Sequence, residues 1–271
     1  MAEVEAFEQY EEAVPLNGPV LISNWPHDVI AEARTAADHT NYTLDDQGWV
    51  LFTTDVDTNG AIAGPDRKLT TKQGTEFTFA DYTQNNALVL KQANQPQTLT
   101  LDSPQFIEEL YFLTISANGQ STLKVEANYE DGTKSQTGTY QPKDWFGSND
   151  ADVAYHGLDR IIVSGRDGFQ TDQLDGRKNF RLYAFTLATD RTKKMESITF
   201  TSTVSGKYPT VLAISKKGYK VTDGIATQRP AANDQQPVAI YSINGQRLNN
   251  LQKGVNILRY SDGTVRKVVI K

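Results

Sequence analysis

The sequence predicts an all-β protein: a two-sheet sandwich or jelly roll followed by a small C-terminal β module. Short runs rich in β-branched and aromatic residues recur along the chain with turn signals between them. No segment keeps the apolar period of an amphipathic helix. A polar stretch with Gly224 and Pro230 precedes the final residues. We therefore expect a β-sandwich over residues 1–218, a linker over 219–236 and a three-stranded β module over 237–271.

The strands of the body are expected in a regular series. The clearest is 122–129, where apolar and polar residues alternate as in a strand with one buried face. Glu130-Asp131-Gly132 is then a hairpin turn into 133–141. Segment 28–37 could also be read as a helix, but its β-branched start favours a strand followed by a loop. Further strands are expected at 19–23, 29–32, 49–53, 76–79, 87–91, 97–101, 107–116, 160–164, 179–187, 195–201 and 210–215.

Composition excludes several classes of function. The net charge of −6 and the lack of a concentrated basic patch argue against a nucleic-acid partner. No run approaches the ~18 apolar residues of a transmembrane helix, so we expect no membrane span. The chain has no cysteine, which rules out disulfides, thiolate metal sites and a cysteine nucleophile. A body of this size does not need disulfides, because the buried fraction of a domain rises with its length.

The sequence of the C-terminal module indicates where the protein is located. Three β-type runs, 238–241, 255–260 and 265–270, are separated by the turn signals Asn244-Gly245 and Asp262-Gly263. The pieces IYSINGQR, KGVNI and KVVIK follow one another in this tail. In this order the tail resembles the C-terminal sorting domain of Bacteroidetes proteins exported by the type IX secretion system. The resemblance implies a secreted protein or one held at the outer-membrane surface.

The body carries a second resemblance, which rests on the order of several segments. These are DVIAE (28–32), GWVLF (48–52), NNALVL (85–90), DWFG (144–147), NFRLY (179–183) and MESITF (195–200). Together they are similar to the galactose-binding-like β-sandwich modules, of the carbohydrate-binding-module kind, in secreted bacterial proteins. The resemblance implies binding of a glycan or glycoconjugate without catalysis.

Flat aromatic rings flanked by polar groups are the side chains that sugar recognition uses. Two tryptophans lie in expected loops, and a third aromatic residue, a histidine and an arginine follow the second of them. The candidate ligand-binding residues are Trp25, Trp145, Tyr155, His156 and Arg160.

Each candidate also has an ordinary structural interpretation. Either loop tryptophan could be a plug over one end of the sandwich, since tryptophan is usually largely buried. Arg160 could form a surface ion pair with Asp152, Asp159 or Asp167. Trp49 lies in an apolar strand, and we expect it in the core.

One loop has the spacing of a calcium site. Asp55, Asp57 and Asn59 occupy the first, third and fifth ligand positions, Gly60 the sharp turn, and Asp66 the last position. The EF-hand prefers glutamate at that last position, and no helix convincingly follows. Asp, Asn and Gly also crowd ordinary turns, so a plain loop is the default interpretation and no cofactor is otherwise expected.

Catalytic motifs are not evident. The histidines, His27, His39 and His156, lack metal-ligand spacing, and no Gly-x-Ser-x-Gly elbow occurs. Asp28 and Glu32 share one strand face but lie about 13 Å apart by strand rise, too far for either glycosidase geometry. We expect a non-enzymatic, glycan-binding protein. The alternatives are a structural or adhesive surface protein that binds another protein, and a carboxylate-based glycoside hydrolase.

Overall fold

The computed structural model describes residues 14–35, 40–147, 152–166, 168–220, 237–260 and 265–270. These residues form strands and loops and contain no helix, which confirms the predicted all-β class. The chain divides into two compact units. The larger is Pro15–Lys220, and the other contains the C-terminal residues 237–260 and 265–270.

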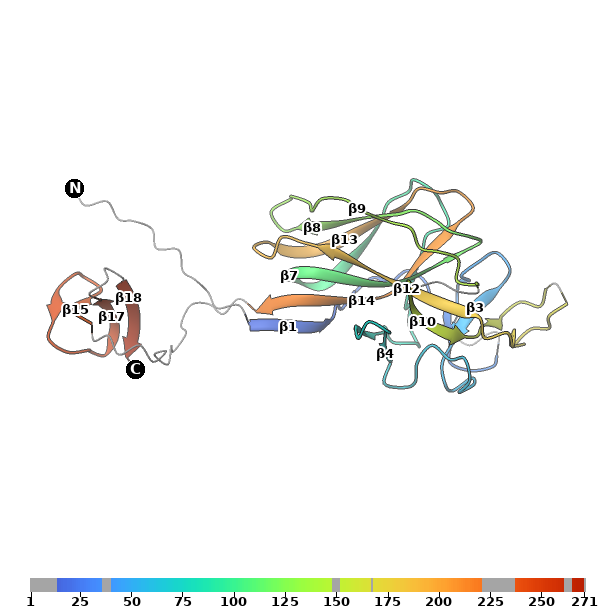
Figure 1. Ribbon diagram of the computed structural model, residues 1–271, viewed down its shortest axis with the longest axis horizontal. Coiled ribbons are helices and arrows are strands. Elements are labelled where there is room, and N and C mark those ends of the chain that lie inside the picture. Colours follow the sequence, from blue (N-terminus) through green and yellow to red (C-terminus); the bar gives the residue numbers. More distant parts are fainter. Residues whose placement is uncertain are drawn as a thin grey trace. The chain divides into compact units, whose positions relative to one another are not determined.

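A nine-stranded sheet organises the larger unit (Figure 1). Six strands follow one another in the order β1, β14, β7, β13, β8, β9, while β12 joins β7 to β10 and β6 joins β14. Their bounds are β1 Val14–Pro19, β6 Leu88–Val89, β7 Gln97–Ala117, β8 Leu123–Tyr129, β9 Gly138–Tyr140, β10 Val153–Leu158, β12 Phe180–Ala188, β13 Lys194–Ser202 and β14 Tyr208–Lys220.

The central strand β7 is 21 residues long and changes neighbours along its length. Its first half pairs with β13, and its second half lies between β14 and β12. The sequence predicted two strands here, 97–101 and 107–116. Pro104 lies at the register shift between Thr100 and Gln105, where a strand tolerates proline. The two predicted strands are one in the structure.

Alternate side chains of β7 enter two different apolar clusters. Leu113 and Ile115 belong to the first cluster, whereas Leu110 and Phe112 belong to the second. Both faces of the sheet are therefore buried at this strand. The first cluster also receives residues from the smaller sheets, which consist of β2 Ile30–Ala31, β3 Trp49–Phe52, β11 Ile161–Ile162, β4 Lys68–Thr70 and β5 Glu76–Thr78.

Local patterns predicted some strands well and missed others. Strand β8 shows the expected alternation of buried and more exposed side chains. Segment 28–35 forms the short strand β2 and then a loop, as favoured over a helix, while residues 36 and 37 lie outside the described part. Strands β4 and β10 were not predicted. The first expected strand, 19–23, was wrong, because β1 ends at Pro19.

The expected linker begins later than predicted. Strand β14 continues to Lys220, and Tyr219 still pairs with Phe106 of β7. Residues 219 and 220 therefore belong to the sheet of the larger unit. The rest of the predicted linker, 221–236, lies outside the described residues.

The C-terminal unit is an antiparallel sheet in the order β16, β15, β17, β18. The strands are β15 Ala239–Ser242, β16 Arg247–Leu248, β17 Gly254–Arg259 and β18 Val265–Ile270. Three strands were predicted, and the structure adds the short β16. The Asn244-Gly245 turn leads into it, with Gly245 at a φ of 79° that glycine adopts without strain. The second predicted turn, at 262–263, lies outside the described residues.

Candidate functional site

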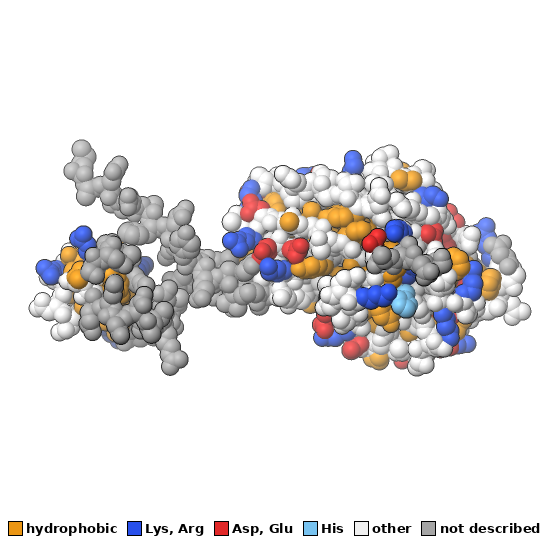
Figure 2. Space-filling model, in the orientation of Figure 1, with side chains coloured by type: hydrophobic (Ala, Val, Ile, Leu, Met, Phe, Trp, Pro, Cys, Tyr) orange, Lys and Arg blue, Asp and Glu red, His pale blue; other side chains and the backbone are white. Residues whose placement is uncertain are grey.

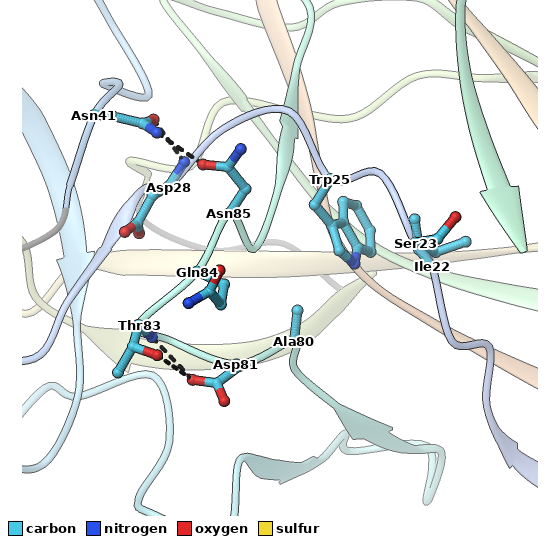
Figure 3. Close-up of a pocket in the computed structure, with 10 residues that line it drawn as sticks. All are labelled: Ile22, Ser23, Trp25, Asp28, Asn41, Ala80, Asp81, Thr83, Gln84 and Asn85. Atoms are coloured by element: carbon cyan, nitrogen blue, oxygen red, sulfur yellow. Dashed lines mark hydrogen bonds between the residues drawn. The ribbon is translucent and has the colours of Figure 1, made fainter. Parts of the chain in front are cut away.

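A pocket with a volume of about 550 Å³ lies between the segment that follows β1 and the loop that precedes β6 (Figure 3). One side comes from residues 22–28 and the other from residues 80–85, with Asn41 between them in sequence. The lining is Ile22, Ser23, Trp25, Asp28, Asn41, Ala80, Asp81, Thr83, Gln84 and Asn85.

Trp25 is the aromatic side chain of this pocket. It is half-buried and packs, with Ile22, against the second apolar cluster. In Figure 3 the indole projects from its own segment toward Ala80 on the facing loop. Packing on the core restricts the indole to few rotamers, so the part that lines the pocket is a fixed apolar surface.

Hydrogen bonds attach the Trp25 segment to the central strand. Asn24 Nδ2 donates to the carbonyl of Thr98 over 3.1 Å, and Thr100 N–H donates to Asn24 Oδ1 over 2.7 Å. The carbonyl of Leu21 accepts from the N–H of Asp102. These bonds at Leu21 and Asn24 hold the segment against β7. They explain why a loop without regular structure has a defined position.

A network of hydrogen-bonded amide and carboxylate groups, partly buried and partly exposed, lies beside the pocket. Asn86 Nδ2 donates to Asp28 Oδ1 over 2.6 Å, and Asn86 Oδ1 accepts from the N–H of Val29 over 3.1 Å. Asn41 Oδ1 accepts from the N–H of Asp28, while Asn41 Nδ2 donates to Asn85 Oδ1 over 2.7 Å. The exposed fraction is 1% for Asp28 and 0% for Asn86. These bonds join three segments that are distant in sequence.

The opposite wall is a tight turn. Asp81 Oδ1 accepts from the N–H and the hydroxyl of Thr83, at 3.0 and 2.9 Å (Figure 3). These hydrogen bonds, helped by the charge of Arg67, lower the pKa of Asp81 below its ordinary value. Asp81 is exposed and ionised at neutral pH, at the rim of the pocket.

Trp145 and Arg160 lie inside the protein instead of at a surface. Trp145 is 3% exposed and belongs to the first apolar cluster, in keeping with the plug interpretation. The Arg160 guanidinium is 3.9 Å from the centroid of the Trp49 ring, and its Nε is 2.9 Å from Asp175 Oδ2. Neither side chain can reach an external ligand in this conformation.

The ion pairs of Arg160 differ from those considered from the sequence. Its partners are Asp175 and, at 3.6 Å, Asp45. Asp152 pairs with Lys143, Asp159 accepts from the backbone N–H groups of Arg160 and Gly176, and Asp167 lies outside the described residues.

Burial dominates the electrostatics of this arginine. Burial lowers the pKa of Arg160 despite its acidic partners, and burial raises the pKa of Asp45. Burial alone would also raise the pKa of Asp175, but hydrogen bonds from Arg177 and Arg160 outweigh it and lower that pKa. We interpret this cluster as part of the core.

Tyr155 and His156 belong to strand β10, not to a loop. Tyr155 is half-buried against the first cluster and pairs with Leu182, whereas His156 is exposed and pairs with Arg181. Neither lines the pocket beside Trp25. Of the five predicted ligand residues, the structure places Trp25 alone in this pocket.

The calcium-like loop uses its acidic groups for local contacts. Asp57 Oδ2 is 2.9 Å from Arg34 Nη2, and Asp57 Oδ1 accepts from the N–H of Asn59. Asp66 Oδ1 accepts from the N–H of Lys68. Within the described ranges, no group of three or more histidine and acidic side chains lies close enough together to hold a metal ion.

No protein-family model matches this sequence, and a search of curated proteins found no matching relative. A helix long and apolar enough to cross a membrane does not occur among the described residues. Apart from Trp25, the pocket residues were not predicted as ligand-binding, among them Asn41, Asp81, Thr83, Gln84 and Asn85. The polar run DYTQNN (81–86) was the available signal, but it also reads as an ordinary turn.

Proposed function

We propose that this protein is a non-catalytic binding protein that recognises a glycan in the pocket beside Trp25. The observation that carries the proposal is the combination of one fixed indole with a lining of amide, hydroxyl and carboxylate groups. An indole stacks on the apolar face of a pyranose, while amides and carboxylates bind its hydroxyl groups. The volume of about 550 Å³ falls in the range of small-ligand pockets.

The pocket is also organised before any ligand arrives. Asn41 and Asn86 hold the Asp28 backbone and side chain, and Thr83 holds Asp81. A binder whose polar groups are already fixed loses little conformational entropy on binding. This property favours recognition of a polar ligand of defined shape.

Two carboxylates line the pocket, so the hydrolase alternative has to be weighed. Glycoside hydrolysis needs one carboxyl group that keeps its proton to protonate the leaving oxygen. The lowered pKa of Asp81 makes it a poor proton donor at neutral pH, and Asp28 Oδ1 is occupied by Asn86. We therefore infer binding without cleavage. Prolonged incubation with a bound oligosaccharide should release no new reducing ends, and release that requires Asp28 or Asp81 would contradict this inference.

The protein-binding alternative has less support. In the described part of the larger unit, the large apolar side chains that are exposed are Leu21 and Phe146. The Arg177 guanidinium covers Phe146 at 4.5 Å from its ring centroid. Charges of both signs are interspersed on the face shown in Figure 2. Scattered apolar residues of this kind are ordinary on a monomer and do not form an adhesive patch.

We further infer that the C-terminal unit directs export, so that the glycan-binding unit acts outside the cell or at the outer-membrane surface. The inference rests on the tail's resemblance to sorting domains and on its division from Pro15–Lys220 as a separate unit. Deletion of residues 237–271, followed by cell fractionation in a Bacteroidetes host, tests it. Retention of the truncated protein in the cell is expected, and unchanged secretion would contradict the inference.

The binding proposal is tested by isothermal titration of the full chain with a panel of plant and host oligosaccharides. A glycan that binds wild-type protein and loses affinity on Trp25→Ala supports binding in this pocket. Failure of every glycan to bind the folded protein would overturn the proposal of glycan binding.

A further inference from the structure

The segment that carries Trp25 begins as a short antiparallel extension of the sheet along β7. Ile22 forms a β-bridge with Leu101, and the N–H of Ser23 donates to the carbonyl of Thr100 over 3.0 Å. This pairing fixes the register of the segment against β7. The register in turn predicts which backbone groups the next residues would use if the strand continued.

Asn24 makes the bonds of that continuation with its side chain. In a continued strand, the Ser23 carbonyl would accept from the N–H of Thr100. The N–H of Trp25 would then donate to the carbonyl of Thr98. In the structure, Asn24 Oδ1 accepts from the Thr100 N–H over 2.7 Å, and Asn24 Nδ2 donates to the Thr98 carbonyl over 3.1 Å. The side-chain amide therefore replaces one peptide group of the strand, and the backbone leaves β7 before Trp25.

The face to which Trp25 points depends on this early departure from β7. Side chains of a strand alternate between its faces, so in a continued strand Trp25 would point away from the face of Ile22, three residues earlier. In the structure both side chains pack against the second apolar cluster. Beyond them, Pro26 has no N–H for a ladder, and His27 already pairs with Ala87 in the loop before β6. Trp25 thus lies in a short crossover between two pairings, with its indole at the pocket (Figure 3).

From this arrangement we propose that Asn24 is the positioning residue of the pocket: its side-chain amide ends the pairing with β7 and thereby directs the Trp25 indole into the site. The effect on affinity rests on the proposed glycan-binding function, whereas the effect on the indole does not. Asn24 is exposed and is not part of the pocket lining, so it acts through Trp25. Without the amide, the Trp25 N–H can take the Thr98 carbonyl, which turns the indole to the solvent face of the extended strand.

The first experiment measures the position of the indole in the full chain without any ligand. Trp49 and Trp145 are 2% and 3% exposed, so acrylamide quenching of tryptophan fluorescence reports mainly on Trp25. The variant Trp25→Phe identifies the share of the signal that belongs to this residue. We expect Asn24→Ala to raise the quenching constant of that share and to shift its emission to longer wavelength, because the indole moves into water.

The second experiment is titration with a glycan that binds wild type. We expect Asn24→Ala to lower affinity about three- to tenfold, up to the loss caused by removing the stacking ring itself. In a Trp25→Ala background, Asn24→Ala should have no further effect, because a positioning residue acts only through the ring that it positions. Additive losses would overturn the assignment, since they would show an effect of Asn24 that does not pass through Trp25.

Asn128→Ala is the matched control for the loss of an amide that connects two strands. Asn128 Nδ2 donates to Ser197 Oγ and to Thr199 Oγ1, each over 3.0 Å, between β8 and β13. It does not line the pocket, so both the quenching constant and the affinity should stay at their wild-type values. All variants are first checked for cooperative unfolding.

The outcomes separate this inference from the function on which it partly rests. Unchanged quenching in Asn24→Ala overturns the inference, even where glycans bind and depend on Trp25. Raised quenching with unchanged glycan affinity overturns the positioning role in binding. If no glycan binds wild type, the proposed function fails, and the quenching data alone decide whether Asn24 positions the indole.

Discussion

The side-chain amide of Asn86 donates a 2.6 Å hydrogen bond to Oδ1 of Asp28, a residue 58 positions earlier in the chain. Both side chains are buried, and Asn86 also accepts from the backbone N–H of Val29. This pair joins the loop before β6 to the segment that carries Trp25. The side-chain amide of Asn86 thus adds to the backbone bonds between the same two segments, in which the N–H groups of Asn86 and Ala87 donate to the carbonyl of His27.

Replacement of Asn86 by alanine should weaken both stability and binding. The change leaves the Asp28 oxygen and the Val29 N–H without these partners in a buried position, which costs about 3 kcal/mol in the free energy of unfolding. Affinity for a glycan should also fall, because the segment that carries Trp25 loses a bond to the facing loop. Urea denaturation and titration measure the two effects. Asn85→Ala removes only an exposed bond to Asn41 and should cost less than about 1 kcal/mol; equal losses for both variants would contradict this role.

The two arginines on Asp175 should differ in their contribution to stability. Arg160 is 8% exposed, so Arg160→Met leaves Asp175 and Asp45 without their buried counter-ion and should cost about 3 kcal/mol or more. The side chain of Arg177 is 50% exposed, and Arg177→Met should cost about 1 kcal/mol or less. Chemical denaturation of both variants gives the comparison. The structural assignment of Arg160 would be wrong if its loss cost no more than that of Arg177, or if it abolished glycan binding in the folded variant.

His27 should make stability fall in mild acid. Burial, with a smaller effect from the charge of Lys91, lowers its pKa from 6.5 to about 4, and its Nδ1 accepts from the N–H of Val89. The unfolded chain therefore binds this proton more readily than the folded chain. The contribution is complete above about pH 6.5 and is lost as pH falls toward 4. Allowing for partial exposure, we expect about 1–2 kcal/mol.

The variant His27→Asn isolates this effect, because the asparagine oxygen can replace Nδ1 as acceptor without titrating in this range. Urea denaturation between pH 4 and pH 7 should show a shallower loss of stability in the variant than in wild type. Parallel pH curves for the two proteins would show that another group is responsible.

The sequence predicted strands whose alternation of buried and exposed side chains is visible within the strand itself. In 122–129 the alternating pattern reflects one buried and one exposed face, and it corresponds to β8. The long strand β7 covers two runs, 97–101 and 107–116, that were predicted as separate strands. The register of β13 shows that the residues between them, Pro104 included, belong to the same strand. Such information lies in the partner strand and not in the local sequence.

The candidate site could likewise be predicted only in part, because most of its residues meet through contacts between distant segments. Trp25 could be selected from the sequence because a tryptophan in a loop is either a ligand-binding aromatic side chain or a plug over one end of the sandwich. Its neighbours in the pocket come from residues 41 and 80–85, and hydrogen bonds between segments that are distant in sequence, among them those of Asn41 and Asn86, bring them together. Trp145 looks like a loop residue in the sequence, but Trp49, Trp145 and Phe180 pack around the Arg160 guanidinium in the core.

The most direct test of the central claim compares Trp25→Ala with Leu21→Ala in titrations with the oligosaccharide that binds wild type most tightly. Leu21 lies on the same segment, is 57% exposed and does not line the pocket, so it controls for the loss of a nearby apolar side chain. Both variants are first checked for cooperative unfolding. We expect Trp25→Ala to lower affinity at least about tenfold through the loss of stacking, and Leu21→Ala to leave it unchanged. Equal affinity of Trp25→Ala and wild type would contradict glycan recognition in this pocket.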